Sequence, residues 1–318
     1  LMAAKILTCS STFRYYLDMR NRILNICIYL LFPLSTLADS LHIPENFDTK
    51  SAKVVVVIHG CLQSAEAIAA GSGWNTIADK HNLFIYYPQV PKSSNILDCW
   101  SWYNPLNQSA KWGQLKKINT QLDKYLKIFK ISKAPVFVTG ISAGGAMAAG
   151  LLACYPEIYK AGALISSPVY GSAHSIISAQ RVLKFGPGPL DTLYRPCSPS
   201  EFKGPVMVIH GLADKTVHPS HAKKIVKDFH PQDLVEKKHS SHKNDAHFHV
   251  TKFYFTNLLK AELVEVEGLE HAWSGSERYL KNKAYIGSDT NNPTILPFFD
   301  TRGPSATELI WNFFRNGN

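Results

Sequence analysis

A run of β-branched residues from Val54 to Ile58 restricts the fold more than any other feature of the chain. Side chains of a strand alternate between its two faces, so a strand without a polar position is buried on both. Strands of this kind belong to parallel sheets that carry helices on both faces. The run therefore predicts an α/β protein.

Later segments continue an alternation of strands and helices. Apolar runs and helical spacing predict strands at 83–87, 136–139, 161–166, 206–209, 250–255 and 263–266, and helices at 113–129, 146–152, 221–229 and 305–314. Right-handed crossovers between such strands build a mostly parallel central sheet flanked by helices. No linker-like stretch divides residues 39–318, so we expect one domain there.

Residues 1–38 have the features of a secretory signal that starts late. Met19 to Arg22 form a basic segment that contains Arg20 and Arg22, residues 23–34 form a short apolar core, and Thr36 to Ala38 suit a signal peptidase. The core is too short to span a bilayer comfortably, although a membrane anchor or a buried first helix is the alternative. We therefore expect Met19 to be the initiator, and a secreted or periplasmic protein without stable membrane insertion.

The charge of the chain is basic but dispersed. Residues 1–38 hold four basic residues and one acidic residue, which leaves about +7 of the formal net charge of +10. Basic residues are denser between Lys223 and Lys243, without interleaved aromatic residues. This pattern is typical of a solvated helix face and loop, and we expect no nucleic-acid partner.

Whether the cysteines form disulfides or remain free thiols depends on the cellular compartment of the protein. Cleavage after residue 38 would leave Cys61, Cys99, Cys154 and Cys197. An even number in an exported protein permits two disulfides, with three possible connectivities. The alternative is four buried free thiols, which requires a cytoplasmic location.

Gly140 to Gly144 read Gly-Ile-Ser-Ala-Gly, between a predicted strand and a helix of small residues. This arrangement is typical of a nucleophile elbow, in which a tight turn presents Ser142 to a pocket. The pentapeptide alone also occurs by chance in chains of this length. The alternative interpretation is the glycine-rich N-terminus of a helix that is capped by the serine. With its flanks, it predicts acyl transfer through a covalent serine ester.

A nucleophilic serine needs a base, and the base needs a carboxylate that orients it. Asp214 follows the strand at 206–209, and His271 follows the last predicted strand. Their order after Ser142 is that of serine, acid and base in α/β-hydrolases. The alternatives are turn chemistry for Asp214 and ordinary surface exposure for His271.

The tetrahedral intermediate of acyl transfer needs two hydrogen-bond donors for its oxyanion. We expect them to be the backbone N–H groups of Ala143 and Cys61; the alternative for Cys61 is an ordinary strand-ending turn. Trp102 and Trp273 could line an apolar acyl pocket, although such residues more often belong to the core or rim.

No cofactor is expected. His239, His242, His247 and His249, with Asp245, could in principle chelate a metal, but their spacing matches no ligand pattern and the stretch is predicted to be a loop. The phosphate-binding G-x-x-x-x-G-K-[ST] motif and a dinucleotide fingerprint are both missing from the sequence.

Further short motifs accompany these residues in a fixed order. They are His59 to Gln63, Gly71 to Asn75 with Ala78-Asp79, Tyr87 to Gln89, Cys99-Trp100 with Trp102, Thr139 to Met147, Val208 to Asp214 with Thr216 to Pro219, Gly268 to Trp273, and Gly303 to Ala306 with Trp311 to Phe314. In these motifs the chain resembles the poly(3-hydroxybutyrate) depolymerase family of esterases, which includes feruloyl and acetylxylan esterases.

The resemblance implies an α/β-hydrolase fold with a triad of Ser142, Asp214 and His271, and it supports Cys61 and Ala143 as oxyanion donors. It also supports a Cys61–Cys99 disulfide, which would leave Cys154 and Cys197 as the second pair. The implied protein is a secreted serine esterase for polyhydroxybutyrate-type polyester or its oligomers. A feruloyl or acetylxylan esterase is the alternative, and a non-catalytic binding protein on a hydrolase scaffold is less favoured.

The chain departs from the family pattern in three places. Trp112-Gly113-Gln114 stands where the family usually has Gly-Glu, and the stretch 237–253 is longer and richer in histidine. The sequence also ends soon after Trp311, without the linker and polymer-binding module usual in depolymerases of insoluble granules. The missing module favours soluble or amorphous esters over crystalline polymer.

Overall fold

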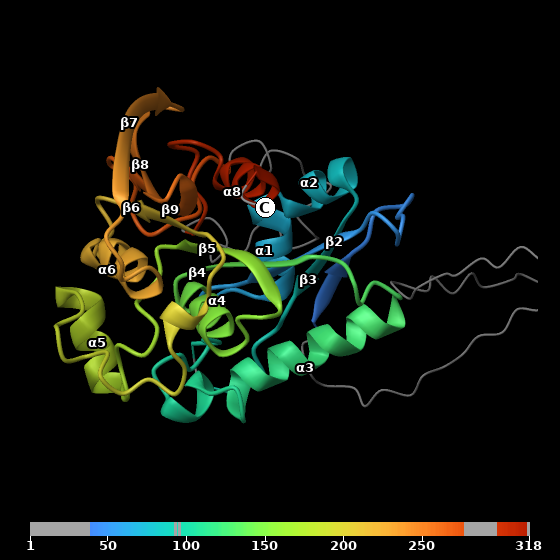
Figure 1. Cartoon of the computed structure of the whole chain (residues 1–318), viewed down its shortest axis with the longest axis horizontal. Coiled ribbons are helices and arrows are strands. Elements are labelled where there is room, and N and C mark those ends of the chain that lie inside the picture. The colour runs from blue at the N-terminus through green and yellow to red at the C-terminus, as the bar shows by residue number, and fades with distance from the viewer. Residues whose placement is uncertain (1–38, 92–93, 95–96, 277–297, 317–318) are drawn as a thin grey trace, which may run out of the picture. The chain divides into compact units, whose positions relative to one another are not determined.

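A computed structural model describes residues 39–91, 94, 97–276 and 298–316. Within these ranges, strands and helices alternate along most of the chain (Figure 1). The strands are β1 (Ser40–His42), β2 (Lys53–Ile58), β3 (Leu83–Tyr87), β4 (Val136–Ile141), β5 (Tyr159–Ile165), β6 (Val206–Gly211), β7 (Val235–Lys243), β8 (Ala246–Phe255) and β9 (Leu258–Val266). The helices are α1 (Ala65–Ser72), α2 (Trp74–His81), α3 (Gly113–Ile128), α4 (Ala143–Cys154), α5 (Ile176–Phe185), α6 (Ser220–Phe229) and α8 (Ala306–Asn316), with 3-10 turns η1 (Pro105–Gln108) and η2 (Pro199–Glu201).

The described strands form one sheet in the order β1-β3-β2-β4-β5-β6-β9-β8-β7. Neighbours from β3 to β9 are parallel, whereas β1, β8 and β7 pair antiparallel. The prediction of an α/β fold with a mostly parallel sheet is confirmed. The carboxyl ends of the parallel strands share one edge of the sheet, so the loops that follow them gather there.

The valine-rich strand β2 separates two hydrophobic cores. Val54, Val56 and Ile58 pack with residues of α3, α4 and α6, whereas Val55 and Val57 pack with residues of α1, α2 and α8. These strand residues are fully buried, as expected for a strand with no polar position.

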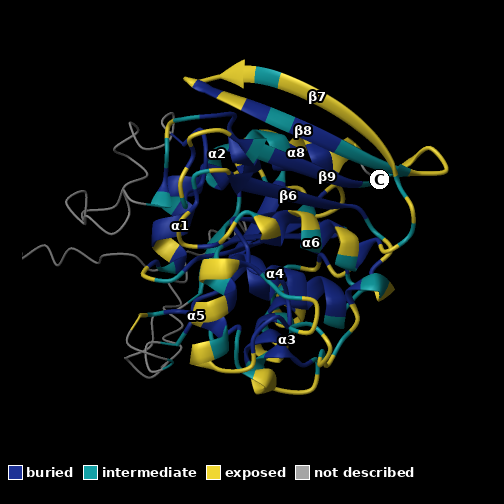
Figure 2. Cartoon of the chain, turned by 90° about the vertical axis from the view of Figure 1, so that its left-hand side faces the viewer, coloured by how far each residue is buried: buried dark blue, intermediate teal, exposed yellow. Residues whose placement is uncertain are grey.

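The stretch 239–249 forms most of a β-hairpin, which corrects the prediction of a loop. β7 pairs with β8 along its full length, and Asn244 and Asp245 turn the chain with φ values of 48° and 58°. The error has a physical reason. β7 is the edge of the sheet and almost all of its side chains are exposed (Figure 2), so it carries no alternating apolar pattern.

The helices α1, α2 and α5 lie in segments where no helix was predicted. α1 and α2 have only 8 residues each and meet at Gly73, whose φ of 78° suits glycine. Ser175 is the N-cap of α5 and forms a reciprocal capping box with Ser178. Helices this short show too few repeats for periodicity to reveal them.

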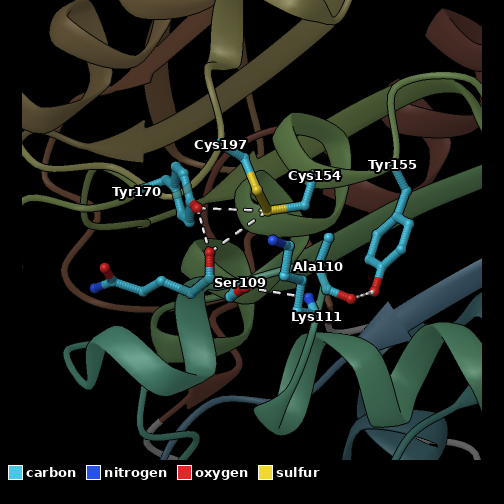
Figure 3. Close-up of a disulfide and its surroundings, with 8 residues drawn as sticks. Ser109, Ala110, Lys111, Cys154, Tyr155, Tyr170 and Cys197 are labelled. Carbon is cyan, nitrogen blue, oxygen red and sulfur yellow. Dashed lines mark hydrogen bonds between the residues drawn. A yellow bond between two sulfur atoms is a disulfide. The ribbon is translucent and has the colours of Figure 1, made fainter.

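A disulfide between Cys154 and Cys197 joins the end of α4 to the segment that precedes η2 (Figure 3). The hydroxyl of Tyr170 lies 3.4 Å from the Cys154 Sγ atom and donates a hydrogen bond to the backbone carbonyl of Gln108. Beside it, the Tyr155 hydroxyl donates to the Ala110 carbonyl at 2.8 Å. The bridge therefore anchors the chain that returns from α5 against the helix that follows Ser142.

The expected signal at residues 1–38, including the expected initiator Met19, lies outside the described residues. Among the residues that are described, no helix combines the length and apolar character needed to cross a bilayer.

Candidate active site

A pocket of about 450 Å³ lies where the loops after β2, β4, β5, β6 and β9 meet. This volume is within the range of roughly 300–1,000 Å³ that is usual for small-molecule sites. The lining residues are Gly60, Cys61, Leu62, Gln63, Trp102, Ile141, Ser142, Ala143, Pro168, Leu183, Ala213, Lys215, Thr216, Val217, Glu270, His271 and Phe298. Most of these side chains are apolar, and Lys215 and Glu270 also line the pocket.

Ser142 sits on the sharp turn between β4 and α4, with φ of 58° and ψ of −125°. The flanking glycines make this turn possible. A Cβ atom on Gly140 would lie 2.4 Å from the Gly144 carbonyl oxygen, and one on Gly144 would lie 2.3 Å from that of Ile58. These contacts are with backbone, so larger residues do not fit, and the spacing G-x-S-x-G follows from the geometry of the turn.

Asp214 and His271 come together across the edge of the sheet. The Nδ1 atom of His271 lies 2.8 Å from Oδ2 of Asp214. Oδ1 of Asp214 accepts hydrogen bonds from the backbone N–H groups of Thr216 and Val217, at 2.9 and 2.8 Å. The carboxylate is therefore held from both sides.

This contact sets the tautomer of His271. A carboxylate only accepts, so Nδ1 of the imidazole carries the proton and Nε2 keeps its lone pair. His271 and Ser142 both line the pocket, although they are 129 positions apart in the chain. The arrangement brings a potential proton acceptor and a hydroxyl into one cavity.

Asp214 is buried, and burial alone would raise the pKa of its carboxyl group. Hydrogen bonds from His210 and His271, the charge of His271 and the backbone N–H of Val217 outweigh this effect and hold the pKa below its ordinary value of 3.8. Asp214 is therefore ionised at neutral pH. His210 was not singled out by sequence reasoning, because nothing in the pattern reveals which way a strand-end side chain points.

The turn after β2 lies directly beside Ser142. A Cβ atom on Gly60 would be 3.4 Å from that of Ser142, and the Gly60 N–H donates to the Gln63 side-chain oxygen at 2.8 Å. Cys61 follows and forms a disulfide with Cys99. Cys61 and Ala143, the first residue of α4, both line the pocket.

His59 is a structural residue of this turn. It is fully buried, and burial lowers the pKa of its imidazole to about 4, so the ring is neutral at pH 7. Its Nε2 atom accepts from the Val90 N–H at 3.3 Å, and its Nδ1–H donates to the Gly60 carbonyl at 2.7 Å. Both ring nitrogens are used, so His59 braces the loop.

The two tryptophans that were expected at the substrate site have different places. Trp102 lines the pocket. Trp273 does not, because its ring is buried in the core and its Nε1–H donates to the Thr307 hydroxyl at 3.0 Å. Neighbouring positions on one loop point in different directions here, so closeness to His271 in sequence was misleading. Pro168, Leu183 and Phe298 complete the apolar wall and had no recognisable sequence signal.

The histidine-rich hairpin lies outside the pocket lining. Ser240 and His249 face each other across β7 and β8, as do His242 and His247. Within the described part of the chain, no group of three or more His, Cys, Asp or Glu side chains is placed to bind a metal ion.

The parallel sheet, the serine turn and the buried Asp–His pair define an α/β-hydrolase. Residues 37–235 match the model of the family described as esterase PHB depolymerase. The chain belongs to this family, as the resemblance in its motifs predicted.

Three curated relatives illustrate the range of the family. Poly(3-hydroxyalkanoate) depolymerase C of Paucimonas lemoignei is 31% identical over 195 residues, which cover 59% of this chain and 46% of the relative. Feruloyl esterase B of Neurospora crassa is 28% identical, with coverages of 59% and 67%. A probable acetylxylan esterase A of Aspergillus clavatus is 25% identical, with coverages of 59% and 64%. The chain thus spans about half to two thirds of the length of these relatives.

Among solved structures, the acetyl xylan esterase from Aspergillus awamori is similar in fold. The TM-score is 0.57 at 18% sequence identity, and the match covers 73% of this chain and 88% of that structure. At this identity the likeness concerns the arrangement of the sheet and helices.

Proposed function

We propose that this protein is a serine esterase that cleaves carboxylic esters through an acyl-enzyme on Ser142. The observation that carries the proposal is the buried pair of Asp214 and His271, whose histidine lines the same pocket as Ser142. Membership of an esterase family supports it independently.

In the proposed reaction, Ser142 Oγ attacks the ester carbonyl while His271 Nε2 takes its proton. Asp214 keeps the imidazole in the required tautomer and stabilises its protonated form. His271 then gives the proton to the leaving alcohol. Water repeats the sequence on the acyl-enzyme and releases the acid.

The oxyanion of the tetrahedral intermediate would be bound by the backbone N–H groups of Cys61 and Ala143. Both residues line the pocket beside Ser142. The first position of α4 adds the positive end of the helix dipole to the second donor. Such fixed donors contribute roughly 3–4 kcal/mol each to the stabilisation of the transition state.

We propose polyhydroxybutyrate-type polyester or its oligomers as the substrate. The apolar wall formed by Leu62, Trp102 and Leu183 suits a short hydroxyacyl unit, and the pocket volume suits an ester segment better than a bulky polysaccharide. A feruloyl or acetylxylan esterase is the second candidate, favoured by the relatives of those names.

A substrate panel tests the proposal and separates the candidates. Purified protein would be given 3-hydroxybutyrate oligomers, amorphous polyhydroxybutyrate, and feruloylated and acetylated xylo-oligosaccharides, with Ser142→Ala as the matched control. We expect the oligomers to be cleaved with the highest kcat/KM, and the variant to lose all activity while its circular dichroism is unchanged. Activity that survives Ser142→Ala would refute the proposed nucleophile. A preference for the sugar esters would select the second candidate.

We further propose that the protein is exported and that residues 1–38 are removed. The disulfides Cys61–Cys99 and Cys154–Cys197 support this, because such bonds persist in oxidising compartments. N-terminal sequencing of protein from the culture medium or periplasm should begin at residue 39. An intact Leu1 would contradict cleavage.

A further inference from the structure

His210 is a buried histidine that the proposed reaction does not use. It is next to last in β6, four positions before Asp214, and its side chain is fully buried. A histidine in the core is costly unless its polar atoms find partners, so its contacts are informative.

The contacts of His210 fix its tautomer. Its Nε2 atom lies 2.9 Å from the carbonyl oxygen of Val217, which can only accept. Nε2 therefore carries the proton, and the uncharged Nδ1 atom has no hydrogen-bond partner among the described residues. Of the two ring nitrogens, only Nε2 makes a hydrogen bond to the described part of the chain.

The same nitrogen also lies near the proposed acid. Nε2 of His210 lies 3.4 Å from Oδ2 of Asp214, the oxygen that accepts the hydrogen bond from the His271 Nδ1–H at 2.8 Å. The distance is at the outer limit of hydrogen bonding, so the bond to Val217 is the stronger of the two. Val217 in turn donates its N–H to Oδ1 of Asp214. His210 thus contacts the carboxylate directly and also holds the residue that binds its other oxygen.

We propose that His210 is a positioning residue that orients the Asp214 carboxylate toward His271. The inference rests on the proposed function, because it assigns His210 a role through the proposed acid. Without the Nε2–H, Oδ2 would lose a donor and the turn from Asp214 to Val217 would lose its tie to β6. The carboxylate would then rotate among more orientations, and fewer molecules would hold His271 ready to accept a proton.

The neighbouring titratable groups do not duplicate this role. His221 approaches from α6, but its Nδ1 accepts from the Val169 N–H at 3.0 Å and its Nε2–H donates to the Val182 carbonyl at 2.8 Å. Burial lowers the pKa of His221 to about 4, so it is neutral at pH 7. It is equally buried but makes no hydrogen bond to Asp214, which makes it a matched control.

The test compares two amides at position 210. In His210→Gln the side-chain nitrogen can reach the place of Nε2, whereas in His210→Asn it falls short by about one bond. Kinetics would use the ester preferred by the wild type, with rates divided by the concentration of sites that a fluorophosphonate titrates. This normalisation counts only folded, reactive enzyme. His221→Gln and His221→Asn are the controls.

We expect His210→Asn to lower kcat about 10-fold or more with KM changed less than 2-fold, and His210→Gln to keep at least half of kcat. A carboxylate that points toward His271 less of the time also stabilises the His271 imidazolium less. The acid limb of the kcat/KM profile should therefore move down by about 0.5 pH unit in His210→Asn and stay in place in both His221 variants. Equal kcat and pH profiles for the two position-210 variants would overturn the inference.

A measurement on the unmodified protein keeps the inference testable if His210→Asn does not fold. Nitrogen-15 shifts of the His210 ring should report the Nε2–H tautomer across neutral pH, and a proton on Nδ1 would overturn the inference. Failure of the proposed function has a different signature: no ester hydrolysis by the wild type, or undiminished hydrolysis by Ser142→Ala. In that case both proposals fall.

Discussion

Two histidine–carboxylate pairs of nearly equal length occur in different regions of this molecule. His271 and Asp214 lie 2.8 Å apart at the pocket, with side chains that are 9% and 0% exposed. His249 of β8 and Glu267, which follows β9, lie 2.7 Å apart, with side chains that are 41% and 50% exposed. Distance alone therefore does not distinguish the two pairs.

Their surroundings do distinguish them. The Asp214 carboxylate accepts backbone N–H bonds on Oδ1 and is shielded from water, so solvent weakens its attraction to His271 less than at an exposed pair. The hairpin pair is open to water and salt, which weaken the same attraction to at most about 1 kcal/mol. We infer that chemistry in this chain depends on burial and fixed partners around a pair, beyond the pair itself.

The largest expected difference between the regions is catalytic. Asp214→Asn should lower kcat by about 10³–10⁴-fold, because an amide of the same shape can no longer select the required tautomer of His271. Glu267→Gln, the matched change in the hairpin pair, should leave kcat within 2-fold. Steady-state kinetics on one ester measures both. Equal losses would show that the buried pair has no special role.

The second difference concerns stability. Gly144→Ala places a Cβ atom 2.3 Å from the Ile58 carbonyl and 2.4 Å from the His59 carbonyl, both backbone atoms that cannot rotate away. We expect a loss on the order of 3 kcal/mol in the free energy of unfolding. Gly188→Ala is the control, since its Cβ would meet only the Asp191 side chain, at 3.2 Å. Urea denaturation should find the control within about 0.5 kcal/mol of the wild type.

The third difference is in pH dependence. Burial lowers the pKa of His59 and of His221 from 6.5 to about 4 in the folded protein. Between pH 6.5 and 4 these histidines bind protons in the unfolded chain but not in the folded protein. Their contribution to the free energy of unfolding is therefore complete above pH 6.5 and is lost as the pH falls toward 4. Each histidine should contribute a loss on the order of 3 kcal/mol. Urea midpoints from pH 7.5 to 4 should show a shallower slope in His221→Gln, and an unchanged slope would contradict this account.

The smallest expected effect belongs to the exposed pair. His249→Ala should change the free energy of unfolding by no more than about 0.5 kcal/mol, because both side chains are largely in water. Added salt should reduce even this difference. A loss above about 2 kcal/mol in thermal or urea denaturation would show that the pair of His249 and Glu267 stabilises the fold more than its exposure predicts.

The same contrast explains how far sequence could predict this structure. The centre of the sheet was predictable because strands such as β2 are apolar at every position, and because the spacing of Gly140, Ser142 and Gly144 leaves few alternatives to a tight turn. The edge strand β7 was predicted as a loop because its side chains are polar and exposed, so its sequence has no alternating apolar pattern that would reveal its pairing with β8. Backbone pairing at an edge depends on the partner strand, which a local pattern does not contain.

The contact between Asp214 and His271 was predictable from their order in the chain, and side-chain direction was less so. Asp214 and His271 meet as expected from their places after β6 and β9. Trp273 was expected at the pocket and lies in the core, whereas the contact of His210 with Asp214 was missed. Each of these depends on which way one side chain leaves a loop or strand end, and that is decided by tertiary packing.

The central claim is that Ser142 is a nucleophile activated by His271. The most direct measurement is labelling with a fluorophosphonate, followed by peptide mass spectrometry, in the wild type, in His271→Ala and in His249→Ala. We predict one adduct on Ser142 in the wild type and in His249→Ala, and labelling at least about 100-fold slower in His271→Ala. No adduct at Ser142, or equal labelling rates in all three proteins, would contradict the account and favour a binding protein on a hydrolase fold.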